Sequence, residues 1–125
     1  MIHLDASFLI RAIEPGSSED RAITGWYDAG ETFAISAVAW AEFMCGPLDR
    51  SELDAAAGII RQYIDFTPAQ AEIAAHLFNR SGRRRGLLAD CMIAAAAIAE
   101  RAPIATGNVK DFRRFESERL TLALA

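Results

Sequence analysis

The sequence predicts an α/β domain in which helices cover both faces of a short, mainly parallel central sheet. Short apolar segments rich in strand-forming residues alternate along the chain with longer segments of helical composition. This alternation is typical of βαβ crossover units, in which the strands run parallel. The chain has 125 residues, of which 52% are hydrophobic, so it is long enough to bury a core. We therefore expect a single domain over residues 1–125.

The first half of the chain reads as two strands and three helices, separated by residues that break or cap helices. Pro15 and Gly16 end the first helix, and Ser17 caps the second, which has acids in its first turn. The expected elements are a strand at 2–4, a helix at 6–14, a helix from 17 to about 30, a strand at 32–36, and a helix from 37 to the break at 46–47.

The second half continues the alternation. Pro68 suits the first position of a helix, and an alanine-rich stretch precedes a short apolar strand that Gly107 closes. The expected elements are a helix at 51–63, a strand at 64–66, a helix from 67 to about 82, a basic loop at 83–86, a helix at 88–101, a strand at 103–106, a helical turn at 111–115 and a final edge strand at 120–124.

Composition limits the possible classes of protein. Thirteen basic and seventeen acidic residues give a net charge of −4, which is unfavourable for non-specific nucleic-acid binding. The N-terminus lacks the basic region of a signal peptide, and no apolar run is long enough to span a membrane. We expect a soluble, cytoplasmic protein without a membrane partner, in which Cys45 and Cys91 are buried, reduced thiols.

Three acidic residues stand alone in apolar surroundings. Asp5 is the only formally charged residue between positions 1 and 10, Glu42 between 32 and 48, and Asp90 between 87 and 99. Burying a carboxylate without a partner is costly, and no Lys or Arg shares any of these segments. A divalent cation could offset the charges and gather the carboxylates together.

The predicted elements can bring these acids to one edge of the sheet. Asp5 directly follows the first strand, and the carboxyl edge of a parallel sheet is where ligands bind. Thr106 ends the last long strand, close to Asn108 and Asp111. We therefore expect a shared site at this edge.

Structural explanations exist for each acid. Asp5 could cap the first helix, and Asp90 or Asp111 could simply be a first-turn acid favoured by the helix dipole. Glu42 could pair with a distant arginine. No phosphate-binding glycine loop, zinc-binding H-E-x-x-H or nucleophile-elbow motif is present in the sequence.

Four short motifs together resemble those of PIN domains, and of VapC-type toxins among them. Residues 5–7 resemble their opening D-x-[ST], and Glu42 looks like their second acid. Residues 90–95 resemble D-x-x-I-A-A, and residues 106–112 resemble the closing T-x-N-x-x-D-F. The motifs occur in the family's order and span nearly the whole chain.

The resemblance implies a three-layer α/β/α fold and endoribonuclease activity that depends on Mg²⁺ or Mn²⁺. It implies Asp5 and Asp90 as principal metal ligands, with Glu42 and Asp111 completing the catalytic cluster. Asn108 would be a neutral supporting group, although it could fill the fourth position instead of Asp111. Ser7 and Thr106 would orient carboxylates or waters by hydrogen bonding.

The resemblance also implies partners for the chain. The first is an RNA substrate, for which tRNA is one candidate. The second is a VapB-type antitoxin that inhibits the toxin, and the third is a second copy of the chain in a homodimer. Arg80 and the arginines at 83–85 could guide the RNA backbone or bind an antitoxin segment, or they could be a solvated helix end.

Two other classes of protein share parts of this pattern. A non-catalytic PIN-like module could keep the fold and bind a partner, but three lone acids argue against it. A phosphoryl-transfer domain also places Asp at a strand end, but it would need a second acid beside Asp5 and a Lys soon after Thr106.

Overall fold

A central parallel sheet organises the chain in the computed structural model, which describes residues 1–124. Its strands lie in the order β3-β2-β1-β4, and each neighbouring pair runs parallel. Their bounds are β1 Ile2–Leu4, β2 Phe33–Ser36, β3 Gln62–Ile64 and β4 Ile104–Ala105. Because every strand points the same way, the carboxyl ends of all of them meet at one edge.

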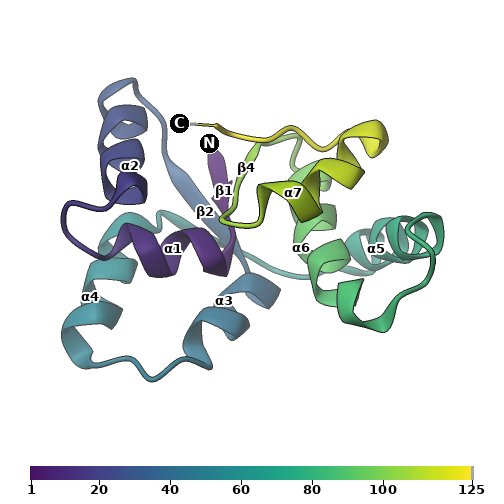
Figure 1. Ribbon diagram of the computed structural model, residues 1–125, viewed down its shortest axis with the longest axis horizontal. Coiled ribbons are helices and arrows are strands. Elements are labelled where there is room, and N and C mark those ends of the chain that lie inside the picture. Colours follow the sequence, from purple (N-terminus) through teal and green to yellow (C-terminus); the bar gives the residue numbers. More distant parts are fainter. Residues whose placement is uncertain (125) are drawn as a thin grey trace.

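Helices cover both faces of this sheet, as the alternating pattern predicts. Figure 1 shows α1, α2 and α4 on one side of the strands and α5, α6 and α7 on the other. The helices are α1 Ala6–Ala12, α2 Ser18–Asp28, α3 Ala37–Met44, α4 Arg50–Ile59, α5 Pro68–Arg80, α6 Leu88–Ala99 and α7 Val109–Phe112, with 3-10 turns η1 at Arg85–Leu87 and η2 at Arg113–Glu118. The predicted α/β fold class is confirmed.

The hydrophobic core explains why these segments form the sheet. Leu4, Ile35 and Ile104 come from three neighbouring strands, and each is at most 1% exposed. Helix α6 contributes Ile93 and the alanines around it, which let the helix approach the sheet closely. Strands that are buried on both faces read as continuous apolar runs, which is the signal seen in the sequence.

Side-chain caps begin several helices at the predicted places. Ser17 accepts a hydrogen bond from the backbone N–H of Asp20, and Thr67 accepts one from that of Gln70. Each cap satisfies an N–H group that the first helical turn leaves without a partner. The cap at Ser17 and the proline at the start of α5 agree with the sequence prediction.

The third strand was predicted two residues too late. It spans Gln62–Ile64 instead of 64–66, because Tyr63 pairs with Ile35 of β2 and the strand must follow that register. The preceding helix therefore ends at Ile59, before the predicted end at residue 63. Local composition could not reveal this boundary, since Tyr63 fits either element.

Other predicted boundaries also shift. The first two helices end at Ala12 and Asp28, slightly earlier than expected, and the helical turn expected at 111–115 begins at Val109. The final edge strand at 120–124 is reduced to one parallel bridge between Ile104 and Leu122. Ala125, the last residue of the predicted domain, lies outside the described residues.

The two cysteines differ in burial. Cys91 is buried in α6 as predicted, whereas Cys45 is exposed at the end of α3, so that prediction was wrong for Cys45. The helical register turns Phe43, and not Cys45, toward the core. None of the helices within residues 1–124 is long and apolar enough to cross a membrane.

Candidate functional site

Polar side chains gather at the carboxyl edge of the sheet. Asp5 follows β1, Ser36 ends β2 and Thr106 follows β4, and all of these side chains are buried. Ser36 accepts a hydrogen bond from the N–H of Ala39 and so begins α3 directly where β2 ends. Parallel strands bring these three positions together, although they lie far apart in sequence.

Asp5 has a nearly complete set of hydrogen-bond donors within the chain. Its Oδ1 accepts from the N–H of Ala6 at 2.8 Å, and its Oδ2 accepts from Ser7 Oγ at 2.9 Å and from Thr106 Oγ1 at 2.8 Å. The residue is only 3% exposed, yet no Lys, Arg or His within residues 1–124 forms an ion pair with it. The N–H at the start of α1 and the two hydroxyl groups thus orient the carboxylate of Asp5, which has no cationic partner among these residues.

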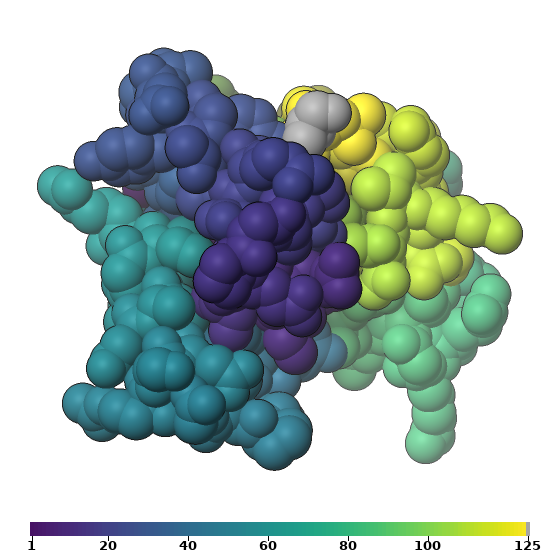
Figure 2. Space-filling model, turned by 60° about the vertical axis from the view of Figure 1, so that its left-hand side comes forward, coloured from purple at the N-terminus to yellow at the C-terminus, as the bar shows by residue number. Residues whose placement is uncertain are grey.

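Ser7 links the N-terminal helix to the segment after β4. Its hydroxyl donates to Asp5 and accepts from the N–H of Gly107 at 2.9 Å. A Cβ atom at Gly107 would lie 3.2 Å from Ser7 Oγ and 3.3 Å from Ser7 Cβ, so glycine allows this close approach. In Figure 2 the N-terminal segment, in purple, lies directly against the yellow-green C-terminal segment.

Glu42, Asp90 and Asp111 lie close enough to Asp5 or to one another to interact electrostatically. Partial burial, together with the negative charges of Asp5 and Asp111, raises the pKa of Asp90 to about 6, against a smaller opposing effect of Arg114. Partial desolvation also raises the pKa of Glu42, with contributions from Asp5 and Asp90. The cluster therefore extends from Glu42 on α3, past Asp5 and Asp90, to Asp111 on α7.

The four acids differ in exposure, which corrects one expectation. Glu42 and Asp111 are exposed, Asp90 is partly buried, and Asp5 alone is fully buried. Glu42 and Asp90 form no ion pair among residues 1–124, whereas Asp111 Oδ1 lies 3.7 Å from Arg114 Nη2. The apolar surroundings of Glu42 in the sequence therefore do not make it a buried acid, because its side chain lies at the rim of the site.

The donor chemistry of this cluster fits a hard divalent cation. Carboxylate oxygens are the ligands that Mg²⁺ and Mn²⁺ prefer, and a cation would relieve the repulsion that raises the pKa of Asp90. Within residues 1–124, however, no three His, Cys, Asp or Glu side chains converge tightly enough to hold an ion directly. Mg²⁺ usually keeps several waters, so looser spacing of the carboxylates is compatible with it.

Several residues at this edge were absent from the sequence-based predictions. Gly107 was read only as the end of a strand, and Ser36 only as part of one, yet both make hydrogen bonds here. Arg114 donates from Nε to the carbonyl of Asp111 at 2.8 Å. The pairing of Asp111 with an arginine three residues later was the available sequence signal for this contact.

Asn108, the other candidate for the fourth position, is exposed. Its backbone N–H donates to Thr106 Oγ1 at 3.0 Å, but its side chain forms no hydrogen bond within residues 1–124. Thr106 thus accepts from the backbone of Asn108 while donating to Asp5.

The family of this chain follows from the fold and from a sequence comparison. The PIN domain family model matches residues 2–117, which is nearly the whole length. The chain belongs to the PIN domain family.

Solved structures with the same fold include components of toxin–antitoxin complexes. A chain of VapBC2 from Rickettsia felis, bound to a DNA fragment from its promoter, is 27% identical with a TM-score of 0.78, and the match covers 98% of each chain. A chain of VapBC-1 from nontypeable Haemophilus influenzae is 19% identical with a TM-score of 0.71, covering 98% of this chain and 97% of that one.

A third similar structure is VapC20 from Mycobacterium tuberculosis, described as a toxin that cleaves the sarcin–ricin loop. It is 18% identical, with a TM-score of 0.63, and the match covers 89% of this chain and 94% of that one. At this identity, the likeness shows the shared fold. None of the curated protein sequences compared with the chain matches it.

Proposed function

We propose that this chain is a metal-dependent endoribonuclease that hydrolyses RNA phosphodiester bonds and acts as the toxin of a toxin–antitoxin pair. The observation that carries the proposal is the buried carboxylate of Asp5, which accepts from three donors but forms no ion pair within residues 1–124. It lies near Asp90, whose pKa is raised by partial burial and by the neighbouring acids. A group of carboxylates that has no cation from the chain beside it is the arrangement that a bound divalent ion stabilises.

Each residue of the cluster has a role in this proposal. Asp5 and Asp90 hold a Mg²⁺ or Mn²⁺ ion, while Glu42 and Asp111 complete the cluster directly or through water. When bound, the ion supplies an activated water and stabilises negative charge on the phosphate. Ser7 and Thr106 are positioning residues, because their hydroxyl groups fix Oδ2 of Asp5. Asn108 is exposed beside them and can support a bound water.

The partner proteins in this proposal come from the similar structures. The relative from Rickettsia felis is part of a VapBC complex, which supports a VapB-type antitoxin as the inhibitor of this chain. A homodimer within such a complex is part of the same proposal. VapC20, which has this fold, is described as a toxin that cleaves the sarcin–ricin loop, and this supports RNA as the substrate class, with tRNA as one candidate.

Cleavage assays on purified variants test the nuclease proposal. The wild type is incubated with labelled tRNA and ribosomal RNA fragments in Mg²⁺, in Mn²⁺ and in EDTA. We expect cleavage only with a metal ion, and a loss of at least about a hundredfold in Asp5→Asn and Asp90→Asn. Asp28→Asn, which removes an exposed carboxylate at the end of α2, before β2 begins, is the matched control and should retain full activity.

The competing binding-module hypothesis predicts a different outcome. A non-catalytic module would show no metal-dependent cleavage, and Mn²⁺ would not raise its melting temperature. Circular dichroism must show that both Asn variants are folded. Full activity in folded Asp5→Asn or Asp90→Asn protein would contradict the proposal.

A further inference from the structure

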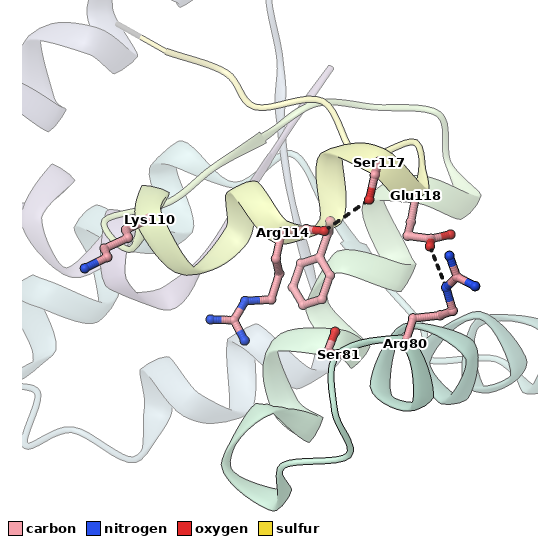
Figure 3. A pocket seen from close by; sticks show the side chains of 7 residues that line it. Arg80, Ser81, Lys110, Arg114, Ser117 and Glu118 are labelled. Atoms are coloured by element: carbon pink, nitrogen blue, oxygen red, sulfur yellow. Dashed lines mark hydrogen bonds and ion pairs between the residues drawn. The ribbon is translucent and has the colours of Figure 1, made fainter.

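A basic hollow lies beside the acidic cluster, between the end of α5 and the C-terminal helices. Its volume is about 440 Å³. Figure 3 shows Arg80 on α5 and Ser81 directly after it facing Arg114, Ser117 and Glu118 on η2, with Lys110 on α7 at the outer end. Phe115 also lines the hollow, but it is buried, so little apolar surface is presented.

Among the charged side chains that line the hollow, the positive ones outnumber the negative ones, and only one of the positive ones has a close ion pair in the described part of the chain. Glu118 is the only carboxylate in its lining, and it already accepts from Arg80 Nε at 3.2 Å and lies 3.1 Å from His76 Nε2. Lys110 forms no ion pair within residues 1–124. Arg114 has only the exposed Asp111 carboxylate at 3.7 Å. Two cations therefore face this hollow with little compensation.

Arg114 connects the hollow to the acidic cluster. Its Nε donates to the carbonyl of Asp111 at 2.8 Å and its Nη2 lies 3.7 Å from Asp111 Oδ1, so a residue that lines the hollow also contacts the acidic cluster. An anion seated on Arg114 would thus lie next to the proposed site of cleavage.

We propose that this hollow binds a backbone phosphate of RNA that flanks the phosphate undergoing cleavage, with Arg114 and Lys110 as its main contacts. This assignment of the ligand rests on the proposed nuclease function. A phosphodiester fits because it is anionic, compact and hydrophilic, whereas an apolar side chain of a protein segment would find little apolar surface in this hollow. Ser81 and Ser117 already donate to backbone carbonyls, so the cations carry the recognition.

The test measures binding separately from cleavage. A labelled oligouridylate of roughly ten nucleotides is titrated in EDTA against the Asp90→Asn protein, which cannot cleave it, at several salt concentrations. Lys110→Gln and Arg114→Gln are then added together in this background. Each substitution is also measured singly, and Arg113→Gln is the control for these single variants, because it likewise removes one positive charge, next to Arg114, and Arg113 does not line the hollow.

We expect the double substitution to weaken binding about five- to twentyfold. The salt slope, which is the steepness with which the logarithm of the binding constant falls as the logarithm of the salt concentration rises, should decrease by about 1.4, since each phosphate contact on a single strand contributes about 0.7. Arg113→Gln should leave the slope nearly unchanged. An equal effect of Arg113→Gln, an unchanged affinity in the double variant, or no measurable binding by the Asp90→Asn parent would overturn the proposal. So would loss of polyglutamate binding in the double variant with oligouridylate binding intact, because that pattern identifies a docking site for an acidic protein segment.

The two proposals fail in different ways. If the wild type does not cleave RNA but binding depends on Lys110 and Arg114, the nuclease proposal is wrong and the phosphate contact stands. If the wild type cleaves RNA but the two substitutions do not change the affinity for the oligonucleotide, the proposed phosphate contact is wrong and the nuclease proposal stands.

Discussion

Thr106 donates a hydrogen bond from Oγ1 to Asp5 Oδ2 at 2.8 Å, although 101 residues separate the two in the chain. The bond joins the ends of neighbouring strands β1 and β4, and both side chains are buried. It therefore connects the stability of the sheet edge to the orientation of the carboxylate that we place at the centre of the site.

Thr106→Val should destabilise the protein by about 1–3 kcal/mol, because it removes a donor from a buried carboxylate and keeps the shape of the side chain. RNA cleavage should fall as well, since Asp5 loses one of its positioning contacts. Chemical denaturation and the cleavage assay measure the two effects. Thr106→Ser retains the hydroxyl and should restore most of both, and equal loss in the Ser and Val variants would contradict this role.

Gly107→Ala should reduce cleavage without a large loss of stability. The added Cβ lies 3.2 Å from Ser7 Oγ, so Ser7 must shift and its hydrogen bond to Asp5 must weaken. Gly58→Ala is the control, because a Cβ at this position in α4 meets no atom within 4 Å.

The control should raise the free energy of unfolding by about 0.5–1 kcal/mol, the usual gain for Gly→Ala within a helix, and leave cleavage unchanged. Equal cleavage by the Gly107→Ala protein and the wild type would show that the position of Ser7 is unimportant.

Asp90→Asn should stabilise the metal-free protein at pH 7–8 by about 1–2 kcal/mol, because solvent partly screens this half-buried carboxyl. The pKa of Asp90 is raised to about 6 in the folded chain, so the ionised carboxylate lowers the free energy of unfolding above that pH. This loss of stability disappears as pH falls from 6 toward the ordinary aspartate value. The stability difference between the variant and the wild type should therefore shrink over this range.

Denaturation in EDTA at several pH values measures this difference, with Asp28→Asn at the end of α2 as the exposed control. Adding Mn²⁺ should reverse the order at neutral pH, because only the wild type keeps both principal ligands. A variant that is less stable than the metal-free wild type at pH 7–8 would show that Asp90 is not strained by its neighbours.

His3 should lower the stability of the protein at acidic pH, whereas Asp90 lowers it at neutral pH. Burial in β1 lowers the pKa of His3 to about 4, with a smaller contribution from the N-terminal charge, so the unfolded chain binds a proton that the folded chain does not. This group costs stability as pH falls below about 6.5, reaching about 2–3 kcal/mol near pH 4.5.

His3→Val should remove that pH-dependent loss, and it also removes Nε2, a buried atom without a hydrogen-bond partner in residues 1–124. The measurement is the change in unfolding free energy between pH 7 and pH 4.5 for the two proteins. The prediction is wrong if both lose the same amount.

The sequence alone determined the class of fold and the residues of the candidate site. Buried strands alternate with capped helices, and this periodicity depends only on local composition and hydrophobic pattern. Asp5, Glu42 and Asp90 were identifiable because an isolated charge in an apolar segment conflicts with the cost of burying it. These signals belong to individual segments, so no knowledge of the folded chain was needed to see them.

Only the tertiary structure decided where the segments meet. Pairing with β2 placed β3 at Gln62–Ile64, and the turn of α3 left Glu42 and Cys45 exposed. The contact of Gly107 with Ser7, and the approach of Arg114 to Asp90, join parts of the chain that are distant in sequence. Such contacts depend on strand register and helix rotation, which the packing of the whole core determines and no local pattern encodes.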